Sequence, residues 1–192
     1  MSPKFGGVAR ALGAVAALLP VVSAVPFGLQ IYQCTKPGVI APGFDDGPWI
    51  YSEDILDRWS HKDLATLTAD EVKQEMILLE EAMVNILGYF PYYMRPPFLS
   101  VNAQALQVLK DLQYHVIIGD LNTKDWEYQS ESGIETAKKL FTDGLDTGYT
   151  IVESHEQEVW THGVLIDYMI EVVKNRGLKS ESPDLQNIGR TY

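Results

Sequence analysis

The sequence has little cysteine and little positive charge, and each shortage limits what the protein can be. Cys34 is the single cysteine among 192 residues, so no disulfide can form within the chain, and a secreted chain with one cysteine leaves it unpaired or awaiting a partner. Only 15 Lys and Arg stand against 26 Asp and Glu, which gives a formal net charge of -11. Because such a surface repels nucleic acid and anionic membranes, we expect no nucleic-acid partner.

The sequence contains only one long apolar run, and it lies near the beginning. Lys4 and Arg10 lie before or at its start, and Val22-Ser23-Ala24 ends it with the small residues of a cleavage site, a pattern typical of a secretory signal peptide. A membrane-spanning helix needs about 20 apolar residues, so we expect no membrane span. The pattern predicts a signal peptide at residues 1–24, one domain at residues 25–192, and secretion to the extracellular space or the cell wall; a buried N-terminal helix is the alternative.

Apolar strand-like segments alternate with amphipathic helical ones after residue 38. Thr68-Ala69-Asp70-Glu71 is a capping box that predicts the start of a helix ending at Gly88, and Ser100 or Asn102 caps the next one. Alternation of strands and helices is the mark of a parallel sheet with helical crossovers. The sequence therefore predicts an α/β fold with strands at 39–44, 92–94, 115–118 and 149–153, and with later helices at 134–141, ending before Gly144, and at 161–175.

Two adjacent carboxylates, Asp45 and Asp46, follow directly on the first predicted strand, and Gly47-Pro48 then forces a turn. Neighbouring residues at a strand end point in different directions, so one Asp can bind a metal ion while the other acts as a base toward water. An ordinary surface turn is the alternative for this motif. Further polar motifs also follow predicted strands, at the edge where α/β folds build their sites: they are Arg95-Pro96-Pro97-Phe98, Asp125-Trp126 and His155.

Together with His61, these motifs resemble in order and wording the NodB-homology polysaccharide deacetylases, also called carbohydrate esterase family four, and in particular the secreted fungal chitin deacetylases. The resemblance covers nearly the whole chain after the signal peptide. The motifs Phe-Asp-Asp-Gly-Pro at 44–48, Arg-Pro-Pro-Phe at 95–98 and Trp-Ser-His-Lys-Asp-Leu at 59–64 carry it most specifically. The resemblance implies a distorted (β/α) barrel and metal-dependent removal of acetyl groups from N-acetylglucosamine residues of chitin or a related polysaccharide.

The resemblance also implies a role for each motif. Hydrolysis of an amide needs an activated water and a protonated leaving nitrogen, and a site of carboxylates and imidazole suits zinc, with cobalt as another divalent ion that fits. We expect a monomer that acts on an N-acetylglucosamine polymer. In this reading Asp45 is the general base, His155 is the general acid, Arg95 and Asp125 tune them, Asp46, His61 and Asp57 hold zinc or cobalt, and Pro97, Phe98 and Trp126 contact substrate.

Several departures from the family pattern predict an impaired enzyme. Asp57 stands where the family has the first of two metal-binding histidines, and only ten residues separate Asp46 from Asp57, so one or two β/α units are missing from the expected barrel. Cys34 lacks the C-terminal partner of the family cysteine. Glu153 places a carboxylate where the family has an apolar residue of the acetyl pocket, and burial there makes it costly or protonated. A catalytically inactive chitin-binding pseudoenzyme is the alternative that these departures leave open.

Overall fold

The computed structural model describes residues 25–46 and 61–180. The expected signal peptide and Asp57 lie outside this part of the chain. The described strands are β1 (Gln30–Ile31), β2 (Val39–Asp45), β3 (Tyr93–Met94), β4 (His115–Ile117), β5 (Leu121–Asn122), β6 (Ile151–His155) and β7 (Lys179–Ser180). The described α-helices are α2 (Ala69–Leu87), α3 (Ala103–Asp111), α4 (Ile134–Thr147) and α5 (Ile166–Asn175), and a π-helical turn at Thr161–Leu165 leads into α5.

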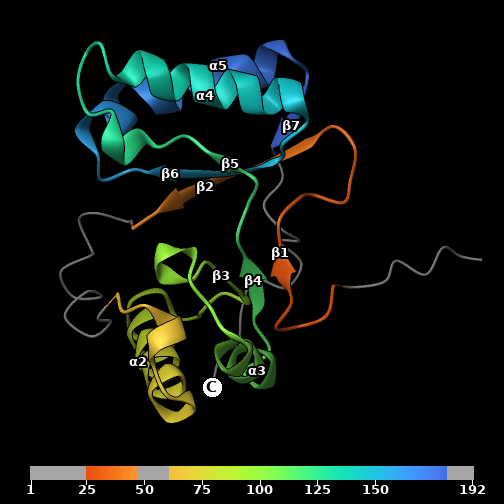
Figure 1. Ribbon diagram of the computed structural model, residues 1–192, viewed down its shortest axis with the longest axis vertical. Coiled ribbons are helices and arrows are strands. Elements are labelled where there is room, and N and C mark those ends of the chain that lie inside the picture. The colour runs from red at the N-terminus through yellow and green to blue at the C-terminus, as the bar shows by residue number, and fades with distance from the viewer. Residues whose placement is uncertain (1–24, 47–60, 181–192) are drawn as a thin grey trace, which may run out of the picture.

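The strands form two parallel sheets, which confirms the predicted α/β alternation. One sheet has the order β5-β6-β2-β7 and the other the order β1-β4-β3, and each pairing is parallel. Helices α4 and α5 cover one face of the four-stranded sheet, while α2 and α3 pack with the three-stranded sheet (Figure 1). Within the described residues no strand pairing joins the two sheets, so they do not close into a barrel.

Strand β2 accommodates Pro42 because one edge of the strand is paired over only two residues. Strand β7 pairs with β2 at Val39 and Ile40, whereas β6 pairs with it from Ala41 to Asp45. The N–H of Ala41 donates to the carbonyl of Thr150 beside β6 (2.8 Å). Alternate residues of a strand direct their N–H groups to opposite sides, so the nitrogen of Pro42 faces the side where no described strand needs a donor.

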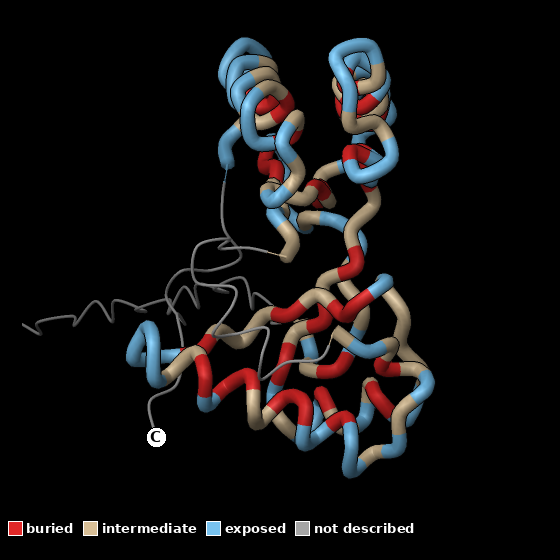
Figure 2. The backbone as a smooth tube through the Cα atoms, turned by 90° about the vertical axis from the view of Figure 1, so that its left-hand side faces the viewer, coloured by how far each residue is buried: buried red, intermediate tan, exposed pale blue. Residues whose placement is uncertain are grey.

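The predicted helix after Thr68 is confirmed. Thr68 and Glu71 form the capping box, and Gly88 ends α2 with φ of 81°. Val72, Met76 and Leu79 are buried in the core that α2 shares with α3 and the three-stranded sheet. Of the two candidate caps for α3 it is Asn102 that accepts the N–H of Ala105 (2.8 Å). Figure 2 shows the buried residues gathered where helices meet the sheets.

Helix α4 is longer than predicted. The sequence predicts a helix that ends before Gly144, because glycine is a poor helix former, but α4 continues to Thr147 and ends at Gly148 with φ of 93°. A Cβ on Gly144 would lie 2.6 Å from Cγ of Leu121 in β5. The glycine therefore lets α4 approach the sheet closely and does not mark its end.

Cys34 lies beside the segment that leads into β6. Its backbone N–H donates to the hydroxyl of Thr150 (2.8 Å), and its thiol lies 3.7 Å from the Thr150 carbonyl. As the single cysteine it forms no disulfide within the chain.

His115 of β4 is expected to make the protein less stable in mild acid. Its ring lies between those of Phe27 and Tyr93, at 4.7 and 4.8 Å between centroids, and its Nδ1 is buried with no hydrogen-bond partner in the described residues. Burial lowers the pKa of His115 below the ordinary value of 6.5. The unfolded chain therefore binds a proton before the folded one does, and stability falls as the pH drops below 6.5.

The measurement is urea unfolding between neutral pH and pH 5, with His115→Phe as the matched variant. Phenylalanine keeps the stack of rings but cannot bind a proton, so we expect a smaller loss of stability in acid. Identical pH dependence in the two proteins would contradict this role of His115.

None of the helices in residues 25–46 and 61–180 combines the length and the apolar character that crossing a bilayer requires.

Candidate active site

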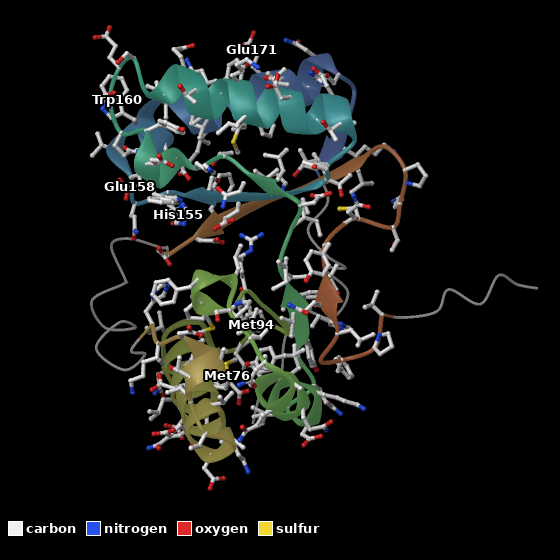
Figure 3. The ribbon with its side chains drawn as sticks, in the orientation of Figure 1. Met76, Met94, His155, Glu158, Trp160 and Glu171 are labelled. Carbon is white, nitrogen blue, oxygen red and sulfur yellow. The ribbon has the colours of Figure 1, made fainter. Side chains whose placement is uncertain are left out.

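The register between β2 and β6 brings two sequence motifs together. Asp45 of β2 pairs with His155 of β6, and Gly43 pairs with Glu153. Both strands end at this point, so the predicted base and acid lie side by side at the carboxyl edge of a parallel sheet, where such folds build their sites. Figure 3 labels His155 at the end of β6 beside β2.

Arg95, expected to tune the base, forms an ion pair with Asp45. The residue follows β3 of the other sheet, and its Nη1 donates to Asp45 Oδ1 at 2.5 Å while its Nη2 donates to the Val152 carbonyl at 3.1 Å. A Cβ on Gly43 would lie 2.6 Å from Arg95 Nη1, so only glycine leaves room for the guanidinium. Burial raises the pKa of Asp45, and the ion pair with Arg95 offsets only part of that rise.

Asp125 holds His155 through both its backbone and its ring. The fully buried carboxylate accepts from the His155 N–H at 2.6 Å and lies 2.9 Å from His155 Nδ1. Hydroxyls of Thr161 (2.7 Å) and Thr123 (3.1 Å) donate to the same carboxylate. Burial opposes charge on His155, but the Asp125 hydrogen bond and charge outweigh it and raise the pKa of His155 above 6.5. The sequence did not identify Thr123 or Thr161, because nothing in the motif marks them.

Asp46 and His61, two of the three expected metal ligands, lie close together. Asp46 Oδ1 is 3.4 Å from His61 Nε2, and the Gln157 amide donates to Asp46 Oδ2 at 3.2 Å. A carboxylate and an imidazole at this separation fit a divalent cation. The third predicted ligand, Asp57, lies outside the described residues. Gln157 lies in none of the sequence motifs, so the sequence did not identify it as a site residue.

Glu153 lies within this site. One ligand atom each from Asp45, Glu153 and His155 falls within 4.8 Å of the others. Burial raises the pKa of Glu153, and the neighbouring Asp45 carboxylate raises it further. A negative charge on this half-buried carboxylate is therefore costly.

The expected substrate-contact residues divide into exposed and buried ones. Phe98 is 69% and Trp126 is 55% exposed, and the Phe98 ring lies edge-on to His61 at 4.9 Å. Pro97 is buried, so its position does not support a direct contact with a polysaccharide. Exposed aromatic faces of this kind suit the apolar faces of sugar rings.

Backbone strain gathers around the same site. Non-glycine residues with positive φ are uncommon, and those that persist tend to lie at functional positions. Apart from Gln113, the described ones lie in loops that border the site: Asp46, His61, Phe98, Leu99 and Lys124.

Comparison with known proteins yields one consistent family. Residues 58–117 match the family model for polysaccharide deacetylases. A chitin deacetylase from Pestalotiopsis is 32% identical over 93% of this chain and 73% of its own length. A probable peptidoglycan-N-acetylglucosamine deacetylase from Arthroderma benhamiae is also 32% identical, over 81% of this chain and 45% of its own length.

The structure of the chitin deacetylase from Colletotrichum lindemuthianum is similar to this fold. It aligns with a TM-score of 0.79 and 27% identity over 88% of this chain and 98% of that one. The two sheets described above therefore match the fold of these deacetylases, a distorted barrel, in an incomplete form.

The sequence alignment with the Pestalotiopsis protein supports an internal shortening. It runs over 219 positions, whereas 93% of this chain is about 179 residues, so about 40 positions have no counterpart here. The predicted incomplete barrel agrees with that difference. By its similarity to the Pestalotiopsis protein over most of both chains, this chain belongs to the polysaccharide deacetylase family.

Proposed function

We propose that the protein removes acetyl groups from N-acetylglucosamine residues of chitin or a related polysaccharide and releases acetate. The observation that carries this proposal is the pairing of Asp45 with His155 at the sheet edge, each with its own partner, Arg95 or Asp125. A base and an acid side by side are what hydrolysis of an amide requires. Chitin deacetylases among the relatives support the substrate class.

Asp45 acts as the base in this proposal. Its carboxylate accepts a proton from the water that attacks the acetyl carbonyl carbon. The raised pKa of Asp45 brings it nearer the working pH, which favours proton acceptance in the transition state. Arg95 holds the carboxylate in place and limits that rise.

His155 acts as the acid. Its hydrogen bond to Asp125 fixes Nδ1 as the donor in that contact, so Nε2 is the nitrogen that gives its proton to the departing amine. The raised pKa of His155 keeps the ring protonated closer to neutral pH. The carbon–nitrogen bond breaks as this proton arrives, which leaves acetate and a free amine on the sugar.

Asp46 and His61 are the described residues that would hold a divalent cation, zinc or cobalt. When bound, such an ion lowers the pKa of water and polarises the acetyl carbonyl. Gln157 donates to Asp46 Oδ2 and so helps to orient the carboxylate toward this role. Asp57 is proposed as a further ligand on the strength of the sequence alone.

Phe98 and Trp126 would stack on sugar rings, residues 1–24 would direct the chain to secretion, and the mature protein would act outside the cell or at the wall as a monomer.

The proposal is tested by measuring the acetate that the full-length protein releases from chitin oligomers with added zinc or cobalt. We expect release that a chelator abolishes and that His155→Ala lowers by about 10²–10⁴-fold, since that is the contribution of a general acid. Folded protein that releases no acetate with either metal would contradict the proposal.

A catalytically inactive chitin-binding protein is the second candidate, and Glu153 is the observation that favours it. A second carboxylate beside Asp45 adds negative charge where an acetyl group must enter. This candidate predicts retention on chitin at moderate salt with no acetate release, and it fails if the protein passes through chitin unbound.

A further inference from the structure

We infer that Thr161 and Gln129 are positioning residues for the reaction proposed above, because together they fix the carboxylate that orients His155. Thr161 is fully buried and donates its hydroxyl to Asp125 Oδ2 at 2.7 Å. Gln129 lies one step further out, with its amide nitrogen 3.3 Å from the Thr161 hydroxyl and 2.7 Å from the Asp125 carbonyl. Their part in the reaction rests on the proposed function, whereas their hold on His155 does not.

Donor and acceptor chemistry fixes the direction of this chain of hydrogen bonds. The N–H of Trp160 donates to Gln129 Oε1 at 2.9 Å, so the NH₂ group of the amide faces Asp125 and Thr161. An NH₂ group only donates, and an ionised carboxylate only accepts. The Thr161 hydroxyl therefore accepts from Gln129 and gives its own hydrogen to Asp125, and hydrogen bonds linked in this way strengthen one another.

The Asp125 carboxylate is held by contacts on both of its oxygens. Oδ1 accepts from Thr123 and lies 2.9 Å from His155 Nδ1, while Oδ2 accepts from the His155 N–H and from Thr161. A carboxylate has about four lone-pair sites, so these contacts fill it and restrain its rotation. Loss of the Thr161 hydroxyl leaves the buried Oδ2 short of one partner, which is costly, and frees the carboxylate to turn away from His155.

A π-helical turn places Thr161 at this position. The turn spans Thr161–Leu165, with both end residues fully buried, and such turns are rare and often lie at functional sites. The first N–H groups of a helical segment lack partners within it. Gln129 accepts that of Trp160, directly before the turn, which Figure 3 labels. Gln129 thereby joins the loop that carries Asp125 to the segment that follows His155.

Because Thr161 and Gln129 act through Asp125 and His155, loss of either side chain should lower kcat and leave KM nearly unchanged. The ring of His155 must present Nε2 to the departing amine, and misplacement of a reacting group by about 1 Å can cost about 100-fold in rate. Loss of an outer partner that orients a functional side chain typically costs about 10–100-fold.

Thr161→Val and Thr161→Ser separate this role from packing. Valine keeps the shape of threonine without the hydroxyl, whereas serine keeps the hydroxyl without the methyl group. We expect Thr161→Val to lower kcat for acetate release from chitin oligomers with added zinc by about 10–100-fold, and Thr161→Ser to retain most of the parent kcat. A packing role predicts the reverse order, so a greater loss in Thr161→Ser than in Thr161→Val would overturn the inference.

Thr147→Val is the matched control, since it makes the same change at an exposed residue of α4 and also removes a hydroxyl hydrogen bond. Its kcat should stay at the parent value. Gln129→Met keeps the length of the side chain without its amide, and as the second variant it should lower kcat in the same direction as Thr161→Val. Thermal melts verify that each variant is folded.

Proton NMR of the protein without substrate tests the hold on His155 independently of activity. An imidazole N–H that donates to a buried carboxylate gives a low-field signal when it exchanges slowly with water, and His155→Ala identifies this signal by its absence. We expect the signal in the parent and in Thr161→Ser, and its broadening or loss in Thr161→Val. If no protein releases acetate, the proposed function fails and the NMR comparison still decides the inference. Equal signals in the parent and in Thr161→Val would overturn it.

Discussion

Replacing Asp45 with asparagine is expected to lower acetate release by about 10²–10⁴-fold, the usual contribution of a general base. Asparagine has nearly the same shape and can still accept a hydrogen bond from Arg95, so the fold should hold. It cannot accept the proton of the attacking water. The measurement is acetate release at saturating chitin oligomer and fixed metal, with circular dichroism to verify that the variant is folded.

Two comparisons separate this effect from a general change of charge. Glu156→Gln removes one negative charge from the half-buried position that follows His155, and is expected to leave the rate within about 3-fold of the parent, because solvent and salt screen a charge that remains in contact with water. Arg95→Ala should lower the rate by a smaller factor than Asp45→Asn, because it leaves the base in place but removes the group that holds it. An Asp45→Asn protein that retains the parent rate would show that another group is the base.

The site was more predictable than the scaffold that holds it. Asp45, Arg95, Asp125 and His155 stand in short motifs whose residue types have few other uses in combination, and in the structure Arg95 contacts Asp45 and Asp125 contacts His155. The strand β2 and the helix α2 were likewise readable from apolar periodicity and a capping box. These are local signals, which a single sequence retains.

What could not be predicted depends on contacts between distant segments. Strands β1, β5 and β7 have two residues each, too few to show an alternation of apolar and polar residues. Strand β3 is equally short, but it could be predicted because it leads into the Arg95 motif. The continuation of α4 through Gly144 depends on the close approach of Leu121. Thr123, Thr161 and Gln157 act through single hydrogen bonds to motif residues, and nothing in their own surroundings in the sequence marks them.

The effect of Glu153 on the site can be judged only from the residues that the fold places beside it. The sequence shows only a carboxylate where an apolar residue is usual. The register of β6 on β2 places that carboxylate within 4.8 Å of donors from both the base and the acid. This second carboxylate beside Asp45 weakens the case for an acetyl pocket at this position.

Asp125→Ala is expected to lower the free energy of unfolding by about 3–5 kcal/mol, the usual cost of removing one partner of a buried charged pair. The fully buried carboxylate accepts from the His155 backbone, Thr123 and Thr161 and contacts His155 Nδ1. Alanine leaves these buried groups without an acceptor. Urea unfolding at neutral pH measures the loss, and Asp143→Ala, at an exposed ion pair with Lys139, is the control, with an expected change of at most about 1 kcal/mol.

The parent and Asp125→Ala can also be compared by the pH dependence of their free energies of unfolding, because the pKa of Asp125 differs between the folded and unfolded states. Burial alone would raise this pKa, but the hydrogen bonds from His155 and Thr161 outweigh burial and hold it below the ordinary value of 3.8. The stability that the ionised carboxylate contributes is thus present above that value and is lost as the pH falls through the lower, folded pKa. The difference in the free energy of unfolding between the parent and Asp125→Ala should therefore become smaller in strong acid. A difference that stays constant from neutral pH into that range would mean that Asp125 stabilises the fold by packing, and that its charge does not hold His155 in place.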